Sequence, residues 1–250
     1  MAIQKFGDSR TIVLYQLTAT PDRTAAIKEG ADSEMYAGTI ATLQDGMDIL
    51  RSMVEGEADV VTTCNTAHHF LAQIDYPEGI RPASLIRSTC ESLIEDMRDG
   101  DVQVFALYTS GTRGAEVYSA EMSQNQISFV EPDMDTQDEL MNAIYKGVKA
   151  FDSDIAFEEG EKVFRKIPEG TTHILAGCTE IPEVIDLVIE RTTDSDLRDK
   201  LRGLRVVDPT SEAFDSVLRI SSVQDDARSK IGINGYEINR YTCPFGFSSV

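Results

Sequence analysis

The chain has little that would link it to a membrane or to nucleic acid. No stretch approaches 18 consecutive apolar residues, and the opening MAIQKFGDSR lacks the apolar core of a signal peptide. Its 23 basic residues are outnumbered by 43 acidic ones, which gives a formal net charge of −20. Nucleic acid and anionic membranes both require basic patches, so neither is expected as a partner. A cytoplasmic location is therefore expected.

Cysteine and histidine are also scarce, and their spacing does not suit a metal ion. The cysteines are Cys64, Cys90, Cys178 and Cys243, and no two of them form a CxxC pair. Two of the three histidines are adjacent, so on a helix their side chains would diverge by about 100°. No metal site is expected. Without a secretory signal, the thiols are expected to be reduced.

What the chain does have is a regular alternation of apolar runs and amphipathic stretches. Strands are predicted at 11–19, 58–63, 81–86, 102–108, 126–132, 172–177 and 204–209. Helices are predicted at 33–56, from 66, at 87–100, from 113, at 135–151, up to 166, at 182–190 and at 211–220. Such alternation indicates an α/β fold with parallel sheets, in which active-site residues follow the carboxyl ends of strands.

One strand–Cys–Thr–helix corner occurs twice, as TTCNTAH at 62–68 and as AGCTEIP at 176–182. A helix N-terminus would lower the thiol pKa below about 8.5 and could bind a carboxylate. Two thiols that face one carbon atom can invert it: one removes the α-proton and the other delivers a proton to the opposite side. The alternative is that both cysteines are small core residues, which is the role expected of Cys90. Cys243 is not expected to act in catalysis.

Five segments together resemble the aspartate/glutamate racemase family over roughly residues 10 to 220. They are PDRTAAI (21–27), TTCNTAHHF (62–70), IYKGVKAF (144–151), LAGCTEIP (175–182) and VVDPTSEAF (206–214). The resemblance implies two pseudo-symmetric α/β lobes, with parallel sheets flanked by helices and an active-site cleft between the lobes. The first lobe would comprise 1–99 plus 209–250 and the second 100–208. A homodimer is also implied.

The resemblance assigns roles to individual residues. Cys64 and Cys178 would be the acid/base pair, acting without a cofactor such as pyridoxal phosphate. The implied substrate contacts are Arg23, Asn65, Thr66, Thr112, Lys149, Thr179 and Glu180. Glu180 stands where glutamate racemases usually have histidine, which favours the aspartate branch. Charge supports this reading, because a dicarboxylic amino acid needs local cations in a protein of net charge −20.

Three functions are therefore weighed. The favoured one is an isomerase that interconverts L- and D-aspartate, or glutamate, by a two-cysteine mechanism. The alternatives are a related isomerase or decarboxylase of dicarboxylic acids and a non-catalytic or impaired dicarboxylate-binding homologue. The last is favoured by the lack of the family's opening strand and GGMGP-like turn. The segment after Ile220 is expected to dock against the first lobe through the apolar residues of 233–242.

Overall fold

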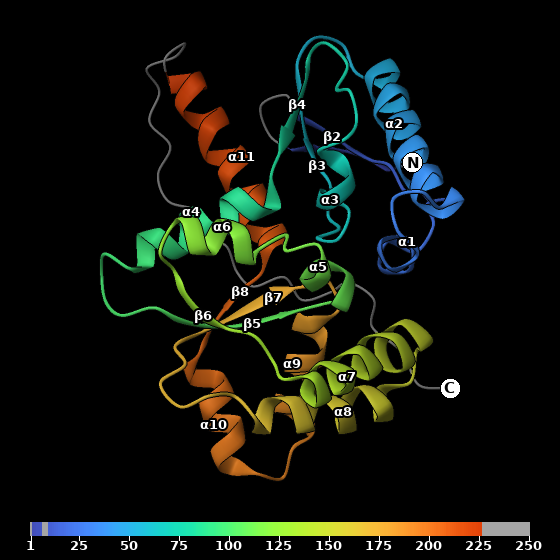
Figure 1. Ribbon diagram of the computed structural model, residues 1–250. Helices are drawn as coiled ribbons and strands as arrows, with labels where there is room; N and C mark the ends of the chain where they lie inside the picture. The colour runs from blue at the N-terminus through green and yellow to red at the C-terminus, as the bar shows by residue number, and fades with distance from the viewer. Residues whose placement is uncertain (1, 7–9, 227–250) are drawn as a thin grey trace, which may run out of the picture. The chain divides into compact units, whose positions relative to one another are not determined.

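The computed structural model describes residues 2–6 and 10–226 (Figure 1). Contacts within the chain separate one unit that ends at Val217 from another that begins at Leu218. The strands are β1 (Ala2–Phe6), β2 (Arg10–Leu14), β3 (Ala58–Val61), β4 (Ile80–Ala83), β5 (Gln103–Tyr108), β6 (Ser128–Val130), β7 (His173–Gly177) and β8 (Arg205–Val207). Residues 233–242, through which docking is predicted, and Cys243 lie outside the described residues.

The helices alternate with these strands. They are α1 (Arg23–Glu29), α2 (Glu34–Met53), α3 (His68–Leu71), α4 (Leu85–Asp96), α5 (Ser110–Gly114), α6 (Ser119–Gln124), α7 (Met134–Asn142), α8 (Ser153–Arg165), α9 (Ile181–Arg191), α10 (Ser195–Gly203) and α11 (Pro209–Asp226). A π-helical turn, η1 (Ala143–Gly147), and a 3₁₀ turn, η2 (Val148–Ala150), follow α7. None of the helices among the described residues is both long and apolar enough to cross a membrane.

The larger sheet has the order β6-β5-β7-β8, and all of its strands are parallel. Alternate residues of β5 enter different cores: Phe105 and Leu107 pack with α7 to α10, whereas Val104 and Ala106 pack with α4, α6 and the start of α11. Figure 1 shows these two groups of helices on the two faces of the sheet. The buried runs of β5 and β7 reflect this double covering.

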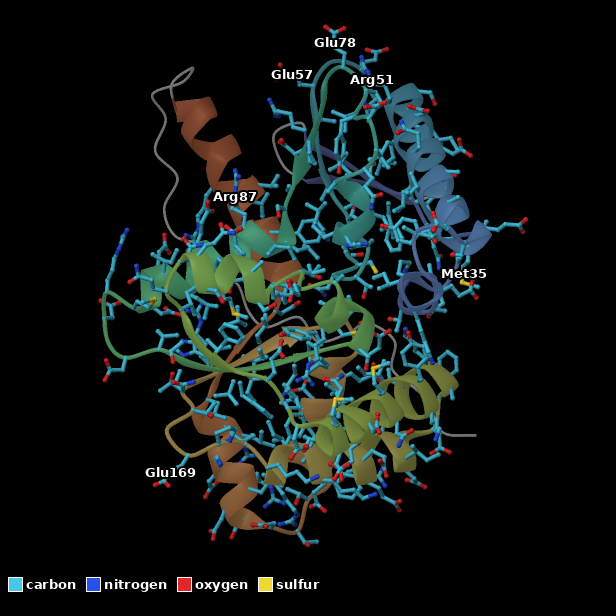
Figure 2. The ribbon with its side chains drawn as sticks, in the orientation of Figure 1. Met35, Arg51, Glu57, Glu78, Arg87 and Glu169 are labelled. Carbon is cyan, nitrogen blue, oxygen red and sulfur yellow. The ribbon has the colours of Figure 1, made fainter. Side chains whose placement is uncertain are left out.

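The smaller parallel sheet pairs β3 with β4. A separate apolar cluster beside it joins α1, α2 and α3, and Leu43, Met47 and Phe70 are among its buried members. We call the β3–β4 sheet with this cluster the first lobe, and the β6-β5-β7-β8 sheet with its helices the second lobe. Figure 2 shows Glu57 and Glu78 together at the amino ends of β3 and β4. The carboxyl ends of both strands therefore lie at the other edge of the sheet.

The prediction of an α/β fold with parallel sheets flanked by helices is confirmed, with local differences. The strand predicted at 11–19 ends at Leu14 and pairs antiparallel with β1. A turn in which Leu17 O accepts from Thr20 N (3.4 Å) and Thr20 Oγ1 (3.1 Å), followed by Pro21, interrupts it. Helix α10 was not predicted. The lobe boundaries proposed from the sequence stay a prediction.

Candidate active site

A cavity of about 420 Å³ lies where loops that follow β3, β5 and β7 meet the start of α1 and the turns after α7. Its walls come from both lobes. The lining residues are Asp22, Arg23, Thr24, Thr63, Cys64, Asn65, Thr66, Thr109, Tyr145, Lys149, Cys178, Thr179 and Glu180. The cavity therefore lies at the carboxyl ends of parallel strands, the edge at which the alternation predicted the active site.

Every site residue predicted from the sequence lines this cavity except Thr112. Both cysteines, 114 positions apart in the chain, contribute to its wall as free thiols. Thr112 is buried behind the wall, where its Oγ1 bonds to Thr66 Oγ1 at 2.8 Å. Cys90 is 2% exposed, and burial raises the pKa of its thiol to about 12, which agrees with the core role expected of it.

Arg23 lies beside Cys64. Asp22 caps α1 by accepting from Ala25 N at 2.8 Å, and this cap fixes the first turn that carries Arg23. Arg23 Nη1 also donates to Pro21 O at 3.2 Å. Burial opposes the charge of Arg23, but the nearby Cys64 sulfur and Asp22 carboxylate have the larger combined effect and raise the pKa of Arg23. Arg23 is therefore a permanent cation at the Cys64 end of the cavity.

His68 holds the backbone of the Cys64 loop. Its Nε2 accepts from Leu85 N at 3.2 Å, so the proton is on Nδ1, which donates to Cys64 O at 3.1 Å. Burial lowers the pKa of His68, which favours this neutral form. The helix predicted from residue 66 begins only at His68 and has four residues, so a helix dipole contributes little at Cys64.

Cys178 is surrounded by different groups. Its thiol donates to Glu180 Oε2 at 2.8 Å, and Thr179 Oγ1 donates to the same oxygen at 3.0 Å. Lys149 Nζ lies 3.7 Å from Glu180 Oε1. Burial and the charge of Glu180 raise the pKa of Cys178 well above its ordinary value. The predicted lowering was therefore wrong for Cys178, because both effects outweigh the N-terminus of α9.

The π-helical turn η1 supplies the remaining wall. Tyr145 donates from its hydroxyl to Asp22 Oδ2 at 3.0 Å, and Lys149 Nζ lies 4.1 Å from the centre of the Tyr145 ring. Burial opposes the charge of Lys149, but Glu180, Tyr145 and Cys178 prevail and raise its pKa. Lys149, predicted on a regular helix, is instead in the 3₁₀ turn that follows η1.

Four threonines form a hydroxyl cluster where the two lobes meet. Thr109 Oγ1 lies 3.3 Å from Thr24 Oγ1, 3.1 Å from Thr66 Oγ1 and 3.1 Å from Thr112 Oγ1. Gly111 makes this approach possible, since a Cβ there would lie 2.7 Å from the Cα and Oγ1 of Thr24. The cluster therefore fixes Thr24, Thr66 and Thr109 along the wall.

Sequence reasoning did not select five lining residues, namely Asp22, Thr24, Thr63, Thr109 and Tyr145. Three of them adjoin selected residues, so the motifs PDRT and TTCNT contained the signal. Thr109 stands three residues before Thr112, which the resemblance selected instead. Tyr145 lies in the segment IYKGVKAF, but a regular helix, as predicted there, would not place it and Lys149 as the π-helical turn does.

The arrangement defines a class of protein: an α/β protein with a polar cavity that contains two thiols and two cations. No group of three or more metal-ligating side chains occurs in the part of the chain that the structure describes. The sequence profile of the Asp/Glu/Hydantoin racemase family matches residues 1–217. The chain belongs to this family.

Solved structures agree with the fold. The Picrophilus torridus aspartate racemase is similar at a TM-score of 0.65 and 24% identity, covering 84% of this chain and 79% of that one. An aspartate racemase homologue from Pyrococcus horikoshii OT3 is similar at a TM-score of 0.53 and 18% identity, covering 76% and 77%. These likenesses confirm the two-lobed α/β architecture that the sequence resemblance implied.

Proposed function

We propose that this protein is an aspartate racemase, active on aspartate or on both aspartate and glutamate, that works with two thiols and without pyridoxal phosphate. One observation carries the proposal: Cys64 and Cys178, from different lobes, line the same cavity. Racemisation needs a base and an acid on two sides of one carbon atom, and two thiols with different partners can fill these roles.

The surroundings of Cys178 favour its protonated form, which suggests how the two thiols divide the roles. Cys178 holds its proton, because burial and Glu180 raise its pKa, and it is therefore the acid. Cys64, next to the guanidinium of Arg23, is the base. The Cys64 thiolate removes the α-proton while the Cys178 thiol gives its own proton to the opposite side. After the product leaves, Cys64 is protonated and Cys178 is a thiolate. The enzyme in this state converts the other enantiomer.

The cations of the cavity support a dicarboxylic substrate. Arg23 offers a planar donor for a bidentate carboxylate contact, and Lys149 offers a second positive charge. Asn65, Thr66 and Thr179 add neutral hydrogen-bonding groups. Because the net charge is −20, these local cations must overcome an unfavourable overall field. The fold-level likeness to an aspartate racemase agrees with this substrate class.

The α-hydrogen of an amino acid is a very weak acid, so the cavity must stabilise the carbanion. Neutralising the α-carboxylate through Arg23 or Lys149 would reduce its repulsion of the developing negative charge, and the protein-lined cavity would strengthen that interaction. A related decarboxylase would need to leave its carboxylate weakly held. Two thiols and two cations therefore favour racemisation over that alternative.

The test is an assay of the purified protein in D₂O, freed of cofactors by dialysis. L-Aspartate and D-aspartate are supplied separately, and circular dichroism follows inversion while proton NMR follows deuterium at Cα. We expect the product enantiomer to carry deuterium from the start in both directions. Release of CO₂ would support the decarboxylase, and binding of aspartate without exchange would support the non-catalytic homologue.

A further inference from the structure

Asn65, next to Cys64 in the chain, is held by a residue of the second lobe. The hydroxyl of Tyr118, which directly precedes α6, donates to Asn65 Oδ1. The two residues are 53 positions apart, and Tyr118 is 1% exposed while Asn65 is 3% exposed. Asn65 nevertheless lines the cavity. A buried phenol thus bonds to one end of an amide that also reaches the site.

The direction of this bond decides which end of the amide faces the substrate. An asparagine side chain has an oxygen that only accepts and a nitrogen that donates two hydrogens. Burial raises the pKa of Tyr118 well above its ordinary value, so the phenol keeps the proton that it donates. Among the described residues, Asn65 Nδ2 has no protein hydrogen-bond partner. The N–H groups are therefore the end left for the cavity.

Tyr118 is itself held firmly. Its ring stacks on that of Tyr108, with centroids 5.9 Å apart and planes inclined by 8°. The hydroxyl of Tyr108 donates to Glu131, and Glu131 Oε2 pairs with Arg113 Nε at 3.0 Å. Both tyrosines are fully enclosed in the core beneath α4 and α6. The phenol of Tyr118 therefore has little freedom to turn away from Asn65.

We propose that Tyr118 is a positioning residue that orients the Asn65 amide so that its N–H groups face the cavity and bind a carboxylate oxygen of the substrate. The inference rests on the proposed function and deepens it. An amide in this orientation attracts an anionic acceptor. The reverse orientation would present an oxygen, which attracts the substrate ammonium group instead.

The main test compares Tyr118→Phe with Tyr108→Phe. Each removes one buried hydroxyl from the same stacked pair, but only the first bonds to Asn65. We expect Tyr118→Phe to raise KM for aspartate about tenfold with a smaller change in kcat, because a charge-assisted hydrogen bond is weakened. Tyr108→Phe should leave KM within about twofold. Equal KM values for the two variants would overturn the inference.

A double-mutant cycle shows whether Tyr118 acts through Asn65. In an Asn65→Ala background, Tyr118→Phe should change KM by less than about twofold, because no amide remains to be oriented. Effects that multiply in the double variant would assign Tyr118 a separate role and overturn the inference. The Kd of L-aspartate, measured by calorimetry, provides the same comparison independently of turnover.

A further variant keeps the test decisive if Tyr118→Phe does not fold. Asn65→Asp retains an acceptor for Tyr118 but replaces the cavity-facing N–H groups with a carboxylate oxygen. We expect KM and Kd for aspartate to rise more than about tenfold, because two anions then face each other. Unchanged or tighter binding would indicate that the amide oxygen, and not the N–H groups, faces the cavity, and would overturn the inference. A wild-type protein that neither binds nor converts aspartate would instead overturn the proposed function, and this inference with it.

Discussion

Cys178 donates its thiol hydrogen to Glu180, a residue only two positions further along the chain. Glu180 in turn receives a hydrogen bond from Thr179 and pairs with Lys149. The carboxylate thus connects the thiol to a cation of the cavity. Burial is the largest cause of the raised pKa of Cys178, and the negative charge of Glu180 is the second largest.

Glu180→Gln should therefore lower the pKa of Cys178, because the amide lacks the charge that opposes thiolate formation. In the direction that uses the Cys178 thiol as the acid, activity falls as pH rises through that pKa. The high-pH limb of the kcat/KM profile should consequently move to lower pH. Glu183→Gln is the matched control, because Glu183 is an exposed carboxylate in the first turn of the same helix. If the high-pH limb stays at the same pH in both variants, Glu180 does not control the pKa of Cys178.

Replacing one thiol at a time should separate proton exchange from inversion. Cys64→Ala and Cys178→Ala should both abolish racemisation, since each retains only one acid/base group. Each variant should still exchange the Cα hydrogen of one enantiomer with D₂O, and the two variants should act on opposite enantiomers. Proton NMR measures the exchange of the Cα hydrogen in each variant with each enantiomer. Full turnover by either variant would contradict the two-thiol mechanism.

Cys90→Ala is the control for loss of a thiol. Cys90 is a buried core residue of α4 and does not line the cavity, so racemisation should continue at the wild-type rate. Removing its sulfur leaves a small void, so the free energy of unfolding should fall by about 1 kcal/mol. Thermal unfolding measures this change. Loss of turnover in a folded Cys90→Ala protein would indicate that the thiol assignment is incomplete.

Arg23→Leu should raise KM for aspartate, because it removes a charge-assisted hydrogen bond worth about 1.5–3 kcal/mol, or about 10- to 150-fold. Lys28→Leu makes the same change of charge at an exposed position on the same helix and should leave KM unchanged. Steady-state kinetics compare the two. An unchanged KM in Arg23→Leu would indicate that a residue other than Arg23 binds the substrate carboxylate.

Gly111→Ala should destabilise the contact between the lobes. The added Cβ would lie 2.7 Å from the Cα of Thr24, a backbone atom that can move only with α1. We expect the free energy of unfolding to fall by about 1–3 kcal/mol, as in overpacked cores. Gly114→Ala, in the same short helix, meets no atom within 4 Å and should be neutral or slightly stabilising. Calorimetric unfolding of both variants tests this.

The sequence predicted the second lobe well, because its strands are buried on both faces. The run THILAG is continuous and apolar, and β7 covers nearly all of it. The first 20 residues were harder to predict. Ile12 and Leu14 belong to an apolar stretch that resembles a buried strand, yet they are 47% and 67% exposed in an antiparallel hairpin. Local apolar content does not specify which strand a segment will pair with.

The site was predictable to the extent that its residues follow strand ends in short motifs. Cys64 and Cys178 were found by their repeated corners, and both line the cavity. The thiol environment was not predictable, because the pKa of Cys178 depends on burial and on the rotamer that brings Glu180 to its sulfur. Tyr118 was missed for a similar reason: its bond to Asn65 joins segments 53 residues apart.

The π-helical turn Ala143–Gly147 makes the cavity sensitive to the length of the chain as well as to its composition. A π turn contains about one residue more than an α turn, so deleting Lys146 would let α7 continue as an ordinary helix. Side chains after the turn would keep their directions, whereas Tyr145, inside the turn, would lose its present place beside Lys149. A single-codon deletion would thus alter one wall of the cavity while preserving every residue that lines it, and an alignment with a gap in this turn would still match Lys149 to its counterpart in a relative.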